Sequence, residues 1–136
     1  MIVNNALKPN RRAGQAVGGT GSDEPFVTIS LLKFKAKADY PDEPDSPLTG
    51  GEAYALYLAA LPACLAAIGA RLAYAGPITG VDVGEMDEPW DMAGVVEYPS
   101  AASVRTLMAL PAYLAIMRHR DAGLAGQFSL RVGVGA

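Results

Sequence analysis

The stretch FVTISLLKF, residues 26–34, decides the fold. Side chains alternate between the two faces of a β-strand. One face of this predicted strand carries Val27, Ile29 and Leu31, and the other carries Phe26, Thr28, Ser30, Leu32 and Phe34. Apolar residues therefore stand on both faces, whereas a sheet with helices on one side only leaves its other side to water. We expect a second cover for the sheet, and a second copy of the same sheet is the simplest.

Outward from this strand, apolar periodicity predicts five more elements. They are a helix from about 50 to 69, strands at 71–78 and 90–98, a helix over 101–122 and a last strand at 125–134. Pro111 is expected to divide the second helix, because proline lacks the N–H that a helix interior needs. The resulting order predicts an α+β fold, with a four-stranded antiparallel sheet and both helices on one face.

The start of the first helix has a clear sequence signal. Thr49, followed three residues later by Glu52, matches the capping-box pattern. Residues 35–50 form a long connection in which Pro41, Pro44 and Pro47 alternate with acidic residues. Loops of this length are often functional lids or else disordered, and the sequence leaves both readings open.

The chain of 136 residues has the length of one domain. We divide it into a flexible extension at 1–25, which lacks a periodic apolar face, and a folded domain at 26–136. The single cysteine, Cys64, excludes an internal disulfide and fits a reducing compartment. No signal-peptide core and no run of 18 apolar residues is found, so we expect a soluble cytoplasmic protein without a membrane partner.

The charge pattern argues against nucleic acid binding. The net charge is −3, and no basic stripe exists apart from Lys33, Lys35 and Lys37 on one strand end. Neutralising phosphates requires many clustered lysines and arginines. We therefore expect no nucleic acid partner.

Six short phrases carry a family resemblance. In chain order they are Leu32-Lys33-Phe34-Lys35, Gly51-Glu52-Ala53-Tyr54, Trp90-Asp91, Glu97-Tyr98-Pro99-Ser100, Pro111-Ala112-Tyr113 and His119-Arg120. Together, over about residues 26–132, they resemble the DUF1330 family of the dimeric α+β barrel (ferredoxin-like) superfamily. The resemblance implies a βαββαβ ferredoxin-like fold and a homodimer whose two sheets pack face to face. It implies no reaction, because the family is uncharacterised and fold alone does not fix function.

His119 and Arg120 are the candidate catalytic residues. His119, the only histidine, shares a helix face with small alanines and is the natural general acid or base near neutral pH. Its alternative role is a charge at the helix end. Arg120 is suited to hold a substrate carboxylate, and its alternative is a salt bridge to Asp91 or Glu97.

An aromatic set is the candidate ligand-binding surface. Aromatic residues with a polar tip often line small-molecule pockets, but they also fill cores. The set consists of Tyr54, Tyr57, Trp90, Tyr98 and Tyr113. Two carboxylates, Glu52 and Glu97, are also placed near a helix–sheet cleft, although Glu52 has the structural role of a capping partner and Glu97 can equally face solvent.

Several site classes are excluded. One histidine and one cysteine cannot build a common zinc site, so no metal is expected. Residues 18–22, GGTGS, lack the lysine of a phosphate loop and follow no strand. We expect no cofactor, and a haem held by His119 is only a minor alternative.

Two functions of different classes remain. The first is a small cofactor-independent enzyme, monooxygenase- or isomerase-like, acting on a small apolar or aromatic metabolite in a helix–sheet cleft. In it, His119 moves a proton while Arg120 or a tyrosine orients the ligand. The second is a non-catalytic ligand-binding or stress-associated dimer with the same cleft.

Overall fold

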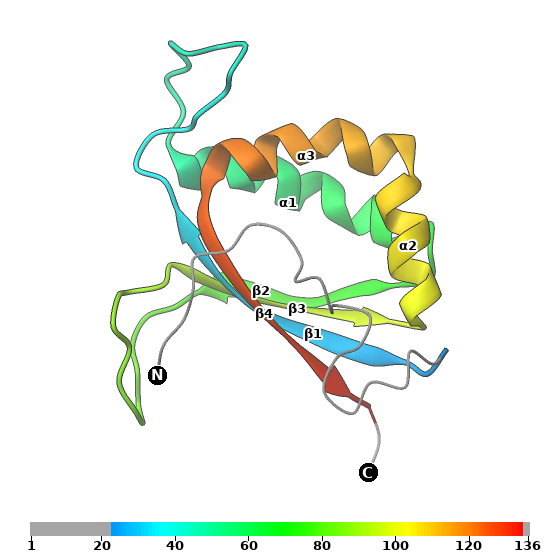
Figure 1. Ribbon diagram of the computed structural model, residues 1–136. Helices are drawn as coiled ribbons and strands as arrows, with labels where there is room; N and C mark the ends of the chain where they lie inside the picture. The colour runs from blue at the N-terminus through cyan, green and yellow to red at the C-terminus, as the bar shows by residue number, and fades with distance from the viewer. Residues whose placement is uncertain (1–22, 135–136) are drawn as a thin grey trace.

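A computed structural model describes residues 23–134, and the expected extension at 1–25 falls almost entirely outside this range. The elements, in chain order, are β1 Phe26–Phe34, α1 Gly50–Ala66, β2 Arg71–Pro77, β3 Met92–Tyr98, α2 Ala101–Ala109, α3 Pro111–Gly123 and β4 Leu124–Gly133. The four strands form one antiparallel sheet in the order β2-β3-β1-β4 (Figure 1). This is the predicted α+β ferredoxin-like arrangement.

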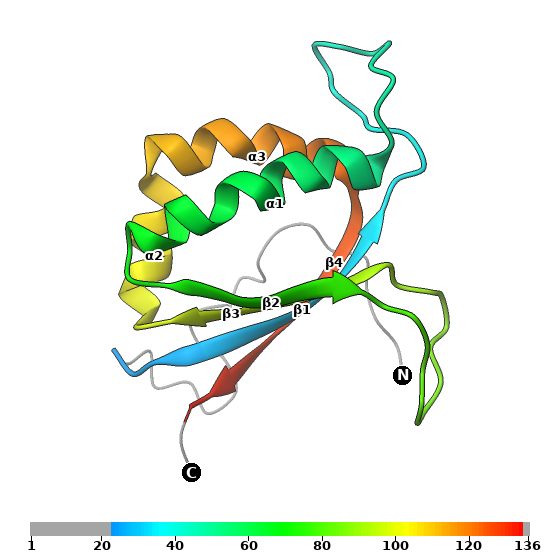
Figure 2. The same ribbon diagram turned by 180° about the vertical axis from the view of Figure 1, so that it is seen from behind.

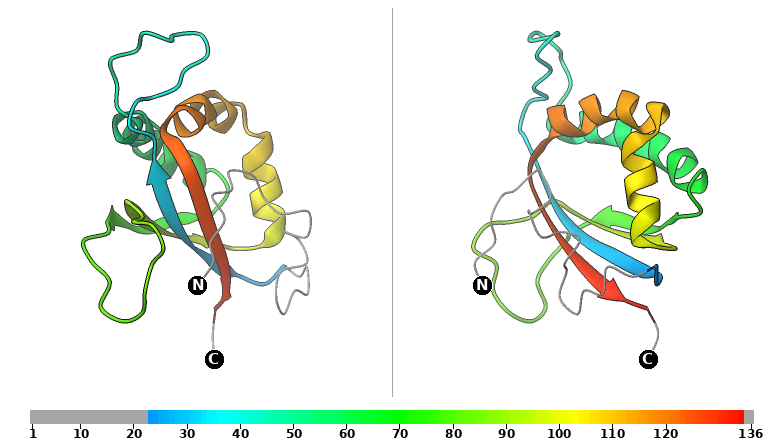
Figure 3. Two further views of the ribbon diagram at one scale, coloured as in Figure 1. Left: turned by 60° about the vertical axis from the view of Figure 1, so that its left-hand side comes forward. Right: turned by 45° about the vertical axis from the view of Figure 1, so that its right-hand side comes forward.

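The helices form a second layer over one face of the sheet. Figures 1 and 2 show α1 and α3 side by side, with α2 turned down toward the sheet at one end, and Figure 3 shows the opposite sheet face without a helix. The interior between the layers is centred on the fully buried Leu65, Leu107 and Leu124. Within residues 23–134, no helix is long and apolar enough to cross a membrane.

Local sequence signals explain the helix boundaries. The Thr49 hydroxyl accepts a hydrogen bond from the Glu52 N–H at 3.1 Å, and the Glu52 carboxylate accepts one from the Thr49 N–H at 2.9 Å. This reciprocal pair is the predicted capping box. Leu110 takes an extended conformation between α2 and α3, so Pro111 begins a new helix at a position where its missing N–H does no harm.

Strand β3 begins two residues later than the sequence pattern suggests. The pattern starts the strand at Trp90, but the ladder between β1 and β3 ends at the pair Leu32 and Met92. Beyond that pair, the Asp91 carboxylate accepts the Phe34 N–H at 2.7 Å. A side chain thus replaces a backbone carbonyl at this point and ends the regular ladder.

Two glycines let three segments meet at the start of the helical layer. The Lys35 N–H donates to the Gly123 carbonyl at 2.8 Å, and the Gly50 N–H donates to the Lys35 carbonyl at 3.1 Å. A Cβ atom added to Gly123 would overlap the Gly50 carbonyl oxygen and lie 3.0 Å from the Tyr54 nitrogen. We call the contact of Lys35, Gly50 and Gly123 the glycine junction.

The sheet face away from the helices is apolar, as the β1 pattern predicts. Ile29 of β1 lies between Val95 of β3 and Leu130 of β4. Several of these side chains are exposed in the single chain, with Ile29 at 37% and Leu130 at 48%. We call this surface the outer apolar face, and it comprises Val27, Ile29, Leu31, Ala93, Val95, Phe128, Leu130 and Val132.

Candidate functional site

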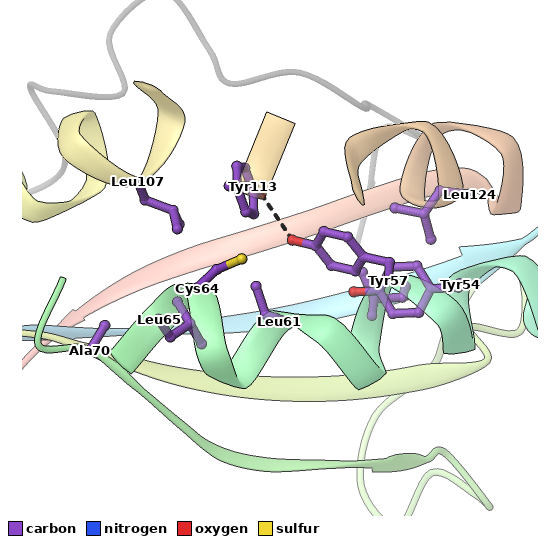
Figure 4. Close-up of a cluster of buried hydrophobic side chains, with 10 residues drawn as sticks. Tyr54, Tyr57, Leu61, Cys64, Leu65, Ala70, Leu107, Tyr113 and Leu124 are labelled. Carbon is purple, nitrogen blue, oxygen red and sulfur yellow. Dashed lines mark hydrogen bonds between the residues drawn. The ribbon is translucent and has the colours of Figure 1, made fainter. Parts of the chain in front are cut away.

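Three of the predicted tyrosines meet between the helices and the sheet. Tyr54 and Tyr57 lie three residues apart on α1, so they share one face of the helix. Their ring centroids are 5.2 Å apart, and the Tyr57 ring lies 6.0 Å from that of Tyr113 on α3. The Tyr57 and Tyr113 hydroxyls are joined by a 2.9 Å hydrogen bond (Figure 4). All three residues are buried.

Tyr98 and Arg120 complete this group, which we call the tyrosine–arginine cluster. Tyr98 extends from β3 on the side that faces the helices. Its ring stacks on that of Phe26, with the two ring centroids 5.3 Å apart. The Arg120 side chain is only 13% exposed and donates to Asp121 at 3.0 Å and to Gln127 at 2.8 Å. Burial raises the pKa values of Tyr54 and Tyr57, and the positive charge of Arg120 opposes part of that shift.

Burial outweighs that charge and keeps the phenols protonated. Loss of solvation is the largest influence on the pKa values of Tyr54 and Tyr57 and raises both well above the ordinary range. Burial, followed by the nearby Tyr113, raises the pKa of Tyr98 to about 12. A burial-raised pKa means that the neutral form is favoured. At physiological pH these side chains are therefore hydrogen-bond donors and not bases.

Two hydroxyls of the cluster have no hydrogen-bond partner within residues 23–134. These belong to Tyr54, which is 7% exposed, and to Tyr98, which is half-buried. Every fully enclosed side-chain polar atom of the described residues does have a partner. The Tyr54 and Tyr98 hydroxyl oxygens therefore border space that a water molecule can enter, and each has a proton to donate.

A row of polar residues continues from Arg120 across the helix-facing side of the sheet. Gln127, which accepts from Arg120, donates to the Ser129 hydroxyl at 2.8 Å. Ser129 in turn bonds the Ser30 hydroxyl at 2.7 Å, from β4 to β1. No sequence pattern singled out Gln127 or Ser129. The sequence held one signal for this row of polar residues, namely Ser30, a polar residue on the strand face that also carries Leu32.

His119 lies apart from this cluster. Consecutive residues of an α-helix point about 100° apart, so His119 and Arg120 leave α3 in different directions. His119 Nδ1 is 2.6 Å from the hydroxyl of the buried Tyr40, in the loop 35–49. Next to it, Arg118 binds the carboxylate of Asp42 at 2.8 Å. The structure thus places His119 where the loop is fastened to the helices.

The other predicted residues have structural partners elsewhere. Trp90 is buried beneath the Lys33 ammonium, which lies 4.7 Å from the ring centroid. Glu97 pairs with Arg71 at 2.7 Å, and Glu52 is the capping partner described above. Arg120 pairs with its neighbour Asp121, and not with the Asp91 or Glu97 considered as alternatives.

Metal ligands do not gather in the described part of the chain. Among residues 23–134, no group of three histidine, cysteine, aspartate or glutamate side chains is placed to hold a metal ion. The chemistry that the cluster offers is hydrogen-bond donation from neutral phenols beside one guanidinium.

Comparisons with known proteins place the chain among proteins whose function is not established. A family model described as "Domain of unknown function (DUF1330)" matches residues 46–134. A search of curated proteins gave no match. Among solved structures, the chain is similar to the RPA0582 protein of unknown function from Rhodopseudomonas palustris, at 25% identity and TM-score 0.80, covering 98% of this chain and 99% of that one.

A second similar structure supports the fold alone. It is a dimeric ferredoxin-like protein of unknown function from Thermobifida fusca, at 19% identity and TM-score 0.50. The likeness covers 81% of this chain and 91% of that one.

Proposed function

Because the chain belongs to the DUF1330 family, whose description assigns no activity, we propose a function from the chemistry of its own interior. The protein is a homodimer that binds a small apolar or aromatic molecule between the helices and the sheet. The observation that carries this proposal is the pair of Tyr54 and Tyr98 hydroxyls, which have no partner among the described residues. Neither hydroxyl oxygen is fully enclosed, so a bound molecule that accepts their protons would take the place of water at two donors that already lie beside aromatic side chains.

The surroundings of these hydroxyls suit a flat, largely apolar body. The ring centroids of Phe34 and Tyr54 are 5.4 Å apart, and the rings of Tyr57 and Tyr113 continue the aromatic surface. Aromatic walls with a few polar groups are the usual composition of small-molecule sites. The ligand-binding set of this proposal is therefore Tyr54, Tyr57, Tyr98 and Tyr113 with Arg120, while Trp90 lies in a different environment.

The outer apolar face supports the homodimer. Ile29, Leu130 and Val132 are 37%, 48% and 38% exposed in one chain, and burying a large aliphatic side chain contributes about 1.5–3 kcal/mol. Two copies packed face to face would remove this row from water. The similar T. fusca protein is described as dimeric.

Sedimentation velocity of the wild type and of Ile29→Asp tests the assembly. We expect a dimer for the wild type at micromolar concentration and a monomer for the variant, because a charge would be buried at the centre of the interface. A second variant, Val83→Asp, changes a 93%-exposed residue of the loop between β2 and β3 and should stay dimeric. A wild type that sediments as a stably folded monomer would refute the dimer.

A catalytic role for His119 is the second part of the proposal, and it requires a substrate that extends from the tyrosine–arginine cluster to the side of α3 that carries His119 and the Tyr40 contact. Since the Tyr40 hydroxyl occupies the Nδ1 side, Nε2 is the ring nitrogen that a substrate would meet. The alternative is a protein that binds the same ligand without chemistry. Thermal shift against a metabolite library, followed by turnover assays on wild type and His119→Ala, separates the two. Turnover lost in the variant supports the enzyme, and equal binding without turnover in both proteins supports the binder.

A further inference from the structure

We propose that Tyr74 is the aromatic anchor of the homodimer, the side chain through which each copy of the chain binds the outer apolar face of the other. This inference rests on the proposed function, because its partner is the second copy proposed there. It goes further by naming the residue that contributes most to the association and the two features of β2 that position it.

Tyr74 is exposed in the single chain, unlike every other tyrosine. All six tyrosines of the chain lie within residues 23–134. Tyr74 is 68% exposed, whereas the other five are buried or half-buried. An aromatic side chain buries about 150–250 Å², so covering this ring would remove on the order of 100 Å² per copy. That is about one eighth of the roughly 800 Å² that each partner contributes to a standard interface.

A shift in the strand register directs Tyr74 away from the helices. Leu72 of β2 pairs with Val96 of β3, and both side chains pack against the core between the helices and the sheet. Regular alternation would point Tyr74 the same way as Leu72. The register shifts after Leu72, so Tyr74 pairs with Val95 and its side chain lies on the outer side of the sheet. An extra residue in a strand is a common means of redirecting a side chain.

Gly76 provides the space that the Tyr74 ring occupies. A Cβ atom at Gly76 would lie 3.0 Å from the Tyr74 hydroxyl oxygen and 3.1 Å from its Cε1 atom. The ring therefore lies along its own strand over the glycine, which is buried although β2 is at the edge of the sheet. A ring that is already held in place loses less conformational freedom when a partner covers it.

Tyr74 extends the outer apolar face to the edge of the sheet. One row of paired residues crosses all four strands and consists of Tyr74, Val95, Ile29 and Leu130. No member of the row is charged, and an aromatic side chain in such surroundings is typical of an interface hot spot. An apolar row is complementary to another apolar row, which a second copy of the chain supplies.

Nitration with tetranitromethane, followed by peptide mapping, tests whether the partner covers Tyr74. The wild type is compared with Ile29→Asp, the variant expected to be monomeric. We expect Tyr74 to be nitrated readily in the variant and about tenfold more slowly in the wild type, because only dissociated chains would expose it. The five other tyrosines are an internal control, since their nitration would report unfolding.

Sedimentation equilibrium of three variants and one control measures the contribution of the ring. Tyr74→Ala should raise the dimer dissociation constant about 100–1,000-fold, because a two-fold dimer loses the hot-spot side chain twice. Tyr74→Phe keeps the ring and should stay within about tenfold of the wild type. Gly76→Ala should displace the ring and weaken the dimer by about tenfold. The control is Leu114→Ala, at a residue 56% exposed on α3, which should leave the constant unchanged.

The outcomes separate this inference from the proposed function. A wild-type dimer whose Tyr74 is nitrated as fast as in the monomeric variant would overturn the anchor and leave the homodimer standing. Tyr74→Ala that dimerises as tightly as the wild type, or Tyr74→Phe that is as weak as Tyr74→Ala, would overturn it in the same way. A wild type that is monomeric would refute both the anchor and the homodimer.

Discussion

Replacing Gly123 by alanine should destabilise the protein strongly, although the change adds only one methyl group. The new Cβ would overlap the Gly50 carbonyl oxygen and approach the Tyr54 nitrogen to 3.0 Å. Both atoms belong to the backbone of α1, so no side chain can rotate away. Helix α1 would have to move away from α3, which would stretch the hydrogen bonds that Lys35 makes to Gly50 and Gly123.

The expected magnitude follows from these contacts. Overpacking of a close contact costs about 2 kcal/mol, and weakening two backbone hydrogen bonds costs about 2 kcal/mol more. Alanine is a better helix former than glycine and returns about 1 kcal/mol. The free energy of unfolding should therefore fall by about 3 kcal/mol, a large share of the 5–15 kcal/mol that is typical of a domain.

Urea denaturation at one fixed protein concentration measures this effect. With a slope of about 1.5 kcal/mol per molar urea, the midpoint should fall by about 2 M. The matched control is Gly133→Ala, because no atom of residues 23–134 lies within 4 Å of a Cβ at that position, and its midpoint should hardly change. A Gly123→Ala midpoint within about 0.3 M of the wild type would refute the close contact as the reason for glycine.

Three further predictions concern single interactions. Tyr57→Phe and Tyr113→Phe should each cost about 1 kcal/mol, and the double variant should cost less than their sum; strict additivity would argue against the hydroxyl pair. Hydrogen bonds from the N-cap residue lower the pKa of Glu52, so its stabilisation is present above the ordinary glutamate pKa and lost as pH falls through the lowered value. The urea midpoints of wild type and Glu52→Gln should therefore differ at pH 7 and converge in acid, and a constant difference would contradict this. Tyr40→Phe removes the hydroxyl bonded to His119 and should speed amide hydrogen exchange in the loop 35–49 without changing that of the sheet; an unchanged loop would show that apolar packing alone holds it.

Much of the fold was predictable because its signals are local. The alternation in β1, the capping box at Thr49 and the break at Pro111 depend on residues a few positions apart, and the structure confirms each. The family and the ferredoxin-like fold, inferred from the order of six phrases, are confirmed by the family model and the similar structures. The late start of β3 escaped prediction because it depends on the Asp91 side chain meeting a distant strand.

The candidate site was predictable only in part. Tyr54, Tyr57 and Tyr113 were chosen as aromatic residues with polar tips, and the structure brings them together. The separation of His119 from Arg120 depends on how α3 is rotated about its axis and on the position of Tyr40, which is 79 residues earlier in the chain. No local pattern specifies either. Binding and catalysis by all of these residues stay predictions.

The polar row from Arg120 to Ser30 has a mechanical consequence. Ser30 sits at the centre of the sheet, directly between Ile29 and Leu31, whose side chains point to the opposite surface. A ligand that displaced the Arg120 side chain would break its hydrogen bond to Gln127. Through the Gln127–Ser129 and Ser129–Ser30 hydrogen bonds, that change would reach the backbone of β1. Ligand binding in the interior and dimerisation through the outer apolar face would then be coupled, and each would change the free energy of the other by the same amount.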